Sequence, residues 1–311
     1  MIMRVSTHNT FERGLSTLQR RQGEMAELQE QMTSGKRISR ASDDPAGAAR
    51  AERALATRTR TEAEQRALAA SRNVVLQAEG ALGDAGDLLQ RVREHMLSAG
   101  NPSYSDRERS DLAQTLRGLR DQLLSVANRG DGAGGYLFGG QGTSAPPFVD
   151  APGGVQFAGD AGALGTANAQ PLPLSVDGGR AWLQAPDPDT GADDLSAFAL
   201  LDRIALELET PGRDNAAISE TVRTGVRGLD AVMDHLGSVR SALGESLNRA
   251  DAVEVRLSQQ ALMAAADRSA AEDLDMVQAV SEFQSQQTGY DAALKVYSMV
   301  QRLSLFDYVG G

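Results

Sequence analysis

The feature that most constrains this chain is a pair of apolar stripes, one near each end, whose members lie three or four residues apart. The first predicts a helix over about residues 8–33, and its members are Phe11, Leu15, Leu18, Gln22, Met25, Gln29 and Met32. The second predicts a helix from residue 276 onward, and its members are Met276, Val280, Phe283, Gln287, Tyr290, Leu294 and Tyr297. This spacing is the heptad pattern of a coiled coil, so we expect a mainly helical protein.

A short polar stretch separates the first predicted helix from the next. In SGKRISRASDDPAGAARA, residues 34–51, Ser34 and Gly35 can end one helix, and Asp44 with Pro45 can begin another. An aspartate at the N-cap accepts hydrogen bonds from free backbone N–H groups, and proline suits the first turn because it lacks an N–H. We predict a hinge at Ser34, Gly35, Asp44 and Pro45.

The remaining helical pattern is nearly a mirror image about the centre of the chain. The predicted helices cover residues 45–99, 105–128, 194–209, 214–268 and 276 to the end. Ser105 and Glu108 form a capping-box signature, Asp214 can cap the fourth helix, and the weak stretch DRSAAEDLD precedes the last one. Arms of matched length favour antiparallel pairing, which brings both termini to one end and the two breaks to the same height.

The centre of the chain has a different character. From Gly130 to Gly191 it is rich in glycine and proline, and its apolar bursts GYLF, PFV, VQFAG, LPLSV and AWLQ predict short strands. The expected fold is a long antiparallel helical coiled-coil bundle with a small β-rich insert in the middle. The expected domains are residues 1–44 (terminal helix and hinge), 45–130 and 193–268 (arms of the helical core), 131–192 (insert) and 269–311 (last helix).

Composition argues against several classes of protein. The formal net charge is −11, whereas nucleic-acid binding relies on basic patches. The chain has no cysteine, which excludes disulfides, thiolate zinc sites and cysteine nucleophiles. The beginning, MIMRVSTHNTFERG, lacks the apolar core of a conventional signal peptide, and no apolar run is long enough to predict a membrane span. We expect neither nucleic-acid binding nor membrane insertion.

Three features resemble functional motifs and have simpler interpretations. The glycines of GDGAGG, residues 130–135, have dinucleotide-site spacing but follow a helix instead of a strand, which favours a helix end and a turn. The aspartates of DPDTGADD, residues 187–194, lack the closing glutamate of a calcium loop, which favours a polar turn that ends in the N-cap of the next helix. The histidines, His8, His95 and His235, are far apart in sequence. We therefore expect no cofactor, metal or catalytic site.

The terminal stripes are the stronger functional signal. A two-helix hairpin with glutamines at several core steps is a poor independent fold, and the last residues add further large apolar side chains. An apolar surface of this kind indicates a partner. The predicted assembly interface consists of Phe11, Leu15, Leu18, Met25, Met32, Phe283, Tyr290, Leu294, Tyr297, Val300, Leu303, Leu305 and Phe306.

Four stretches carry a resemblance to the flagellin-like proteins of the bacterial flagellum. They are MRVST at residues 3–7, QMTSGKRISRASDDPAGAARA at 31–51, LRDQLLSVANRGDGAGGYLFGG at 119–140 and YSMVQRLSLFDYVGG at 297–311. The ending is more similar to the hook-associated proteins of the hook–filament junction than to flagellin, apart from its final Val-Gly-Gly. The resemblance covers both helical arms, and it makes Met3 an alternative start to Met1.

The resemblance implies a non-enzymatic structural subunit that joins hook and filament. Such a protein leaves the cell through the flagellar type III export pathway, without a cleavable signal peptide, and self-assembles outside it. Its implied partners are identical subunits, the neighbouring hook-associated protein, flagellin and a cytoplasmic export chaperone. Two alternatives remain open: flagellin itself, and a coiled-coil adaptor or type III secretion translocator.

Overall fold

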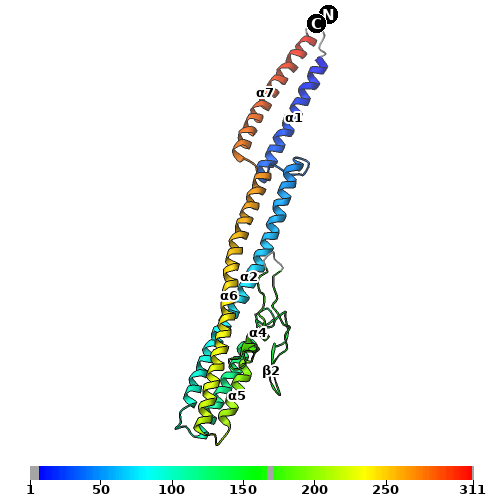
Figure 1. The fold of residues 1–311 in the computed structure, drawn as a ribbon. Helices are drawn as coiled ribbons and strands as arrows, with labels where there is room; N and C mark the ends of the chain where they lie inside the picture. The colour runs from blue at the N-terminus through cyan, green and yellow to red at the C-terminus, as the bar shows by residue number, and fades with distance from the viewer. Residues whose placement is uncertain (1–6, 167–170, 310–311) are drawn as a thin grey trace. The chain divides into compact units, whose positions relative to one another are not determined.

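The computed structural model describes residues 7–166 and 171–309, and it describes side chains for residues 12–166 and 171–299 (Figure 1). The chain forms two compact units. The terminal unit consists of Met1–Thr61 and Gln259–Gly311, and the central unit consists of Glu62–Ser258. Two long helices, α2 (Pro45–Ala99) and α6 (Asn215–Glu272), contribute residues to both units.

In the terminal unit, α1 (Thr7–Ser34) packs against α7 (Met276–Val309). Arg21 of α1 donates a hydrogen bond to the Gln286 side chain at 3.3 Å, and the Leu274 N–H donates to the Gly35 carbonyl at 3.0 Å. Sequence position therefore rises along α1 as it falls along α7, and the pair is antiparallel (Figure 1). The beginning of α1 and the end of α7 lie at the same end of this hairpin, as the sequence predicted.

The other long helices begin where their caps predict. Asp44 and Asp214 each accept a hydrogen bond from the backbone N–H three residues later, at 2.9 and 2.7 Å. α3 (Asp106–Ala127) opens with the predicted Ser105–Glu108 capping box. Two predicted boundaries are wrong. α5 (Ala197–Glu209) is capped by Ser196 instead of an aspartate, because residues 193–195 form a strand. α6 continues to residue 272, because its alanine-rich last turns are good helix formers, so the second break is only residues 273–275.

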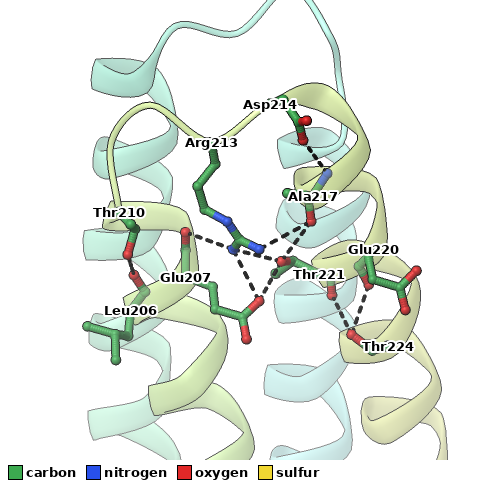
Figure 2. Close-up of polar contacts among 9 residues, drawn as sticks. All are labelled: Leu206, Glu207, Thr210, Arg213, Asp214, Ala217, Glu220, Thr221 and Thr224. Carbon is green, nitrogen blue, oxygen red and sulfur yellow. Dashed lines mark hydrogen bonds and ion pairs between the residues drawn. The ribbon is translucent and has the colours of Figure 1, made fainter.

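The turn between α5 and α6 is held by the side chain of Arg213 (Figure 2). Its guanidinium donates to the Glu207 carbonyl and carboxylate at 3.3 and 3.2 Å, to the Thr221 hydroxyl at 2.9 Å and to the Ala217 carbonyl at 3.4 Å. The Thr221 hydroxyl also donates to the same carboxylate. The charges of Arg213 in the turn and Glu207 of α5 thus satisfy each other, and the bonds to Thr221 and Ala217 tie the turn to α6.

The insert contains less β-structure than its sequence predicted. The PFV and VQFAG bursts form an antiparallel hairpin of β1 (Phe148–Ala151) and β2 (Gly154–Phe157). A second, smaller pair consists of β3 (Ala185–Pro186) and β4 (Asp193–Leu195). GYLF and LPLSV contribute only isolated bridges, and AWLQ lies largely in a short helix, α4 (Gly178–Leu183). The predicted strand is wrong there because Asp177 caps the helix by accepting the Arg180 N–H at 3.0 Å.

Aromatic side chains from the insert and from α5 form the centre of the core of the central unit. Trp182 lies with its ring centroid 5.4 Å from that of Phe138 and 6.0 Å from that of Phe198. Phe148 contacts Phe157 of the paired strand, with centroids 5.3 Å apart, and also packs near Trp182 and Phe198. Trp182, Phe138 and Phe198 are at most 1% exposed. The insert therefore shares its core with the helices and is not a separate globule.

A buried arginine links α3, β1 and α5. Arg120 of α3, whose side chain is 7% exposed, makes two hydrogen bonds to the Asp150 carboxylate of β1 and an ion pair with Asp202 of α5 at 3.1 Å. The hydrogen bonds with Asp150 raise the pKa of Arg120 despite its burial. The same bonds hold the pKa of Asp150 below its ordinary value. A charged pair of this kind fixes the insert hairpin against the helices through both shape and charge.

Candidate assembly surfaces

The seam between α1 and α7 is a regular coiled-coil contact. Along each helix, a residue faces the other helix at every third or fourth position. On α1, the residues that face it are Gly14, Leu18, Arg21, Met25, Leu28 and Met32, all buried or half-buried. On α7 they are Ala279, Phe283, Gln286, Tyr290, Ala293 and Tyr297. Both sets alternate steps of four and three, which is the heptad spacing expected for two helices that pack along their length.

Glycines allow two large side chains to enter this seam. A Cβ atom on Gly14 would lie 3.3 Å from the ring of Tyr297, and one on Gly289 would collide with the guanidinium of Arg21. Each helix thus provides a flat position opposite a long side chain of the other. The sequence stripes did not include Gly14, Arg21 or Gly289, because none of them is apolar. A search for small residues opposite long ones at matched heights could have found these pairs.

About half of the members of the predicted stripes lie in the seam. Leu18, Met25, Met32, Phe283, Tyr290 and Tyr297 lie in the seam. The alternate members of both stripes are displaced by one residue from the seam, so Leu15 and Leu294 remain 42% and 40% exposed. The side chains of Phe11, Val300, Leu303, Leu305 and Phe306 lie outside the described ones, although their backbones belong to α1 and α7.

α7 is apolar on more than the face that it turns to α1. Beside the seam, Met276, Val280 and Leu294 form a second row that is 37–44% exposed. On the opposite side of the helix, Val277 and Met299 are 83% and 61% exposed, and Val296 on its other flank is 60% exposed. Polar residues such as Gln284, Asp291 and Lys295 lie between these apolar side chains, and large apolar side chains that stay exposed beside one another indicate a contact surface. Within the described chain, only the seam side of α7 is covered.

The loop at the predicted hinge is bonded directly to the short break after α6. Gly35 ends α1 with φ at +70°, a left-handed conformation that favours glycine. Beyond it, the Arg37 N–H donates to the Glu272 carbonyl at 2.7 Å, and residues 36 and 273 form an antiparallel bridge. Lys36 pairs with the carboxylate of Glu272 at 3.4 Å. The expectation that the two breaks lie at the same height is confirmed.

The loop between α1 and α2 is packed and hydrogen-bonded. Arg37 donates to the Ala271 carbonyl at the end of α6 at 2.8 Å, and it pairs with Asp44 at 3.3 Å. The Gly47 N–H, and after it Arg37, keep the pKa of Asp44 below its ordinary value. Ile38 is buried and packs over Gly47. A Cβ atom on Gly47 would lie only 2.5 Å from the Cδ1 atom of Ile38. Sequence reasoning identified Asp44 and Pro45 but missed Arg37, Ile38 and Gly47, which depend on tertiary contacts.

The motif-like features are structural elements of the fold. In GDGAGG, Asp131 accepts hydrogen bonds from two following N–H groups and builds a turn after α3. In DPDTGADD, Asp187 caps its own turn and Asp189 pairs with Arg227 at 2.9 Å. Among the described residues, no three potential ligands converge as a metal site would require, and no helix has the length and apolarity of a membrane span.

Comparison with known proteins accounts for this arrangement. Residues 5–143 match the model of the bacterial flagellin N-terminal helical region, and residues 226–309 match that of the C-terminal helical region. Flagellar hook-associated protein 3 of Salmonella typhimurium is 31% identical over 316 residues, which cover 98% of this chain and 99% of that one. The chain belongs to the flagellar hook-associated protein 3 family. The counterpart in Escherichia coli is 30% identical, with the same coverage.

Solved structures show the same fold. A putative flagellar hook-associated protein from Vibrio parahaemolyticus superposes with a TM-score of 0.65 at 19% identity, over 74% of this chain and 99% of that one. The flagellar junction protein FlgL from Legionella pneumophila gives a TM-score of 0.60 at 18% identity, over 72% of this chain and 100% of that one. The resemblance to the hook-associated proteins within the flagellin-like family is thus confirmed, and so is the predicted fold class.

Proposed function

We propose that this chain is a structural subunit of the bacterial flagellum, located where the hook meets the filament. Two relatives that align with this chain over almost their whole length are named flagellar hook-associated protein 3, which supports this placement. In this proposed role the chain is a structural subunit that catalyses no reaction and uses no cofactor. It leaves the cell by flagellar type III export, aided by a cytoplasmic chaperone, and functions outside the cell.

The observation that carries the proposal is the incomplete burial of α7. The seam covers one face of this helix, whereas Val296 on its flank and Met299 on the opposite face are 60% and 61% exposed. In a permanent assembly, neighbouring subunits would cover these side chains. The proposed neighbours are identical copies, another hook-associated protein on one side and flagellin on the other. The whole predicted interface, including the residues whose side chains are not described, belongs to this proposal.

The test is electron microscopy of flagella from a strain that lacks this gene and carries variants of it. We expect the deletion strain to have hooks without filaments and to release flagellin into the medium. Val296→Asp with Met299→Asp should reproduce this phenotype. Each new charge would be buried without a partner in the assembly, at a cost of several kcal/mol. The variant chain should still be exported. Normal filaments in the deletion strain would overturn the proposal.

Two control variants separate assembly from other effects. Val296→Leu with Met299→Leu keeps the surface apolar and should retain filaments. Val149→Asp places the same charge on another apolar side chain, 48% exposed on β1 of the insert, and should also retain them. Circular dichroism of the purified Asp variant should match the parent, since the replaced side chains are exposed in the monomer. If Val149→Asp removed filaments equally, the importance assigned to α7 would be wrong.

A further inference from the structure

Charge is distributed unevenly within the terminal unit. This unit holds 14 basic and 14 acidic residues, so the whole net charge of −11 resides in the central unit. Its N-terminal part, residues 1–61, has 11 basic and 7 acidic residues, and its C-terminal part, residues 259–311, has 3 basic and 7 acidic ones. One part of the unit is basic and the other is acidic by the same amount. The two parts attract each other within one unit, as Lys36 and Glu272 do, and charges that have no partner there can attract a second copy.

The basic side includes a continuous strip on α2, here called the arginine face. Its members are Ala46, Ala49, Arg50, Arg53, Thr57 and Arg60, all exposed. Most of them are spaced by four and three residues, so they share one side of the helix. No acidic residue lies among them, and none of the three guanidinium groups forms an ion pair with any residue that the structure describes. Arg53 only donates to the Ala49 carbonyl, at 3.0 Å.

A second strip on α6, here called the leucine–methionine face, has the opposite character. Its members are Gln259, Leu262, Met263, Ala266, Asp267 and Ala270, all exposed. Leu262 and Met263 are 71% and 66% exposed. The other side of α6 at this level is already packed, with Ala264 and Ala271 at most 7% exposed. The face contains no basic residue, and Asp267 has no ion pair among the described residues.

We infer that the arginine face of one copy packs against the leucine–methionine face of the next copy. The small residues on both strips would allow two helices to approach closely. The aliphatic stems of Arg53 and Arg60 would cover Leu262 and Met263, and a guanidinium would reach Asp267. Pairing of the arginine face with itself would oppose like charges. A contact between two different faces repeats head to tail, so it builds a ring or a helix instead of a closed dimer.

This inference rests on the proposed function and adds to it a contact between identical subunits. The chain has no cysteine, which makes crosslinking a clean test. Arg53→Cys and Ala266→Cys would be produced as separate chains in one deletion strain, and the isolated flagella would be mildly oxidised. We expect a disulfide-linked dimer only when both variants are present. Glu52→Cys and Ala265→Cys, one residue away and pointing elsewhere, are the matched controls and should give none.

A charge reversal provides the second measurement. Arg53→Glu with Arg60→Glu should reduce the fraction of cells with filaments by about tenfold or more, because it places like charges opposite Asp267. Adding Asp267→Arg to the same chain should restore part of it. Thermal unfolding of the purified variants should be unchanged, because these side chains are exposed.

Each alternative outcome overturns the inference. Antibody labelling of the chain at the hook tip, with no mixed dimer, would refute this contact and leave the proposed function intact. Absence of the chain from the hook tip would refute both. An Arg53→Cys dimer formed without the second variant would show a closed contact. If Leu262→Asp with Met263→Asp stopped export and no mixed dimer formed, this face would serve a partner inside the cell.

Discussion

The central and terminal units bury their apolar side chains to different extents. In the central unit, five aromatic rings including that of Trp182 pack together, and the core includes residues from the insert and from four helices. In the terminal unit, the α1–α7 seam includes Arg21 and Gln286, and Val277 on the back of α7 is 83% exposed. The central unit therefore has a large core of its own within one chain, although Leu97, Leu206 and Val255 are exposed. In the terminal unit, α7 is covered on one side only. The difference indicates which part is built to fold alone and which to assemble.

We expect the largest difference between the two units in limited proteolysis of protein that has been verified to be monomeric. The terminal hairpin opens locally at little cost because its burial is incomplete, whereas the central unit must unfold globally to be cut. We expect cleavage before about residue 40 and after about residue 275, leaving a resistant core, and mass spectrometry would locate the cuts. Terminal arms that resist cleavage as long as the core would contradict the comparison. Assembly into flagella should protect the arms.

A core truncation should distinguish the units more quantitatively. Phe198→Ala removes a fully buried ring beside Trp182 and should lower the free energy of unfolding of the central unit by about 3–5 kcal/mol. Trp182 is the only tryptophan, so its fluorescence during urea unfolding reports on this unit. As a control, Val277→Ala at an 83% exposed position of α7 should change the result by less than about 0.5 kcal/mol. Equal effects would mean that the two regions are not energetically distinct.

The smallest expected effect concerns the Arg120–Asp150 pair in acid. The folded pKa of Asp150 is depressed, so its contribution to stability is present above the ordinary carboxyl pKa and is lost as pH falls through the folded value. Asp150→Asn should therefore destabilise the central unit at pH 7, by less than about 1 kcal/mol, because the carboxylate is 48% exposed and screened by water. The difference from the parent should begin to shrink below about pH 4 and disappear as the pH falls through the lower folded pKa of Asp150.

Urea unfolding at neutral and acid pH would measure this effect. Asp160→Asn, an exposed carboxylate in the same insert, is the matched control and should show no such pH dependence. If the effect of Asp150→Asn were the same in acid as at pH 7, the pair would act through shape alone. In either case the terminal unit should be unaffected, which keeps the comparison between the units intact.

Much of this fold could be predicted from the amino-acid sequence, because helix ends depend on residues close by. α2 begins and ends at the predicted residues, Pro45 and Ala99, and α3 opens with the predicted capping box. Asp44 caps α2 by bonding a backbone N–H only three residues away. Such contacts form wherever the local sequence is right. The family could also be recognised, since its stretches are continuous in sequence.

Tertiary structure decided which side of each helix meets its partner. Leu15 and Gly14 are neighbours, and hydrophobicity favours Leu15 for the seam, but Tyr297 needs the open space over Gly14. That choice depends on the height at which two distant helices pair, which spacing within one helix cannot specify. The same holds for Arg37, whose hydrogen bond to the Ala271 carbonyl spans most of the chain. Local hydrogen bonding thus determined the elements, and packing between distant segments determined the surfaces they present.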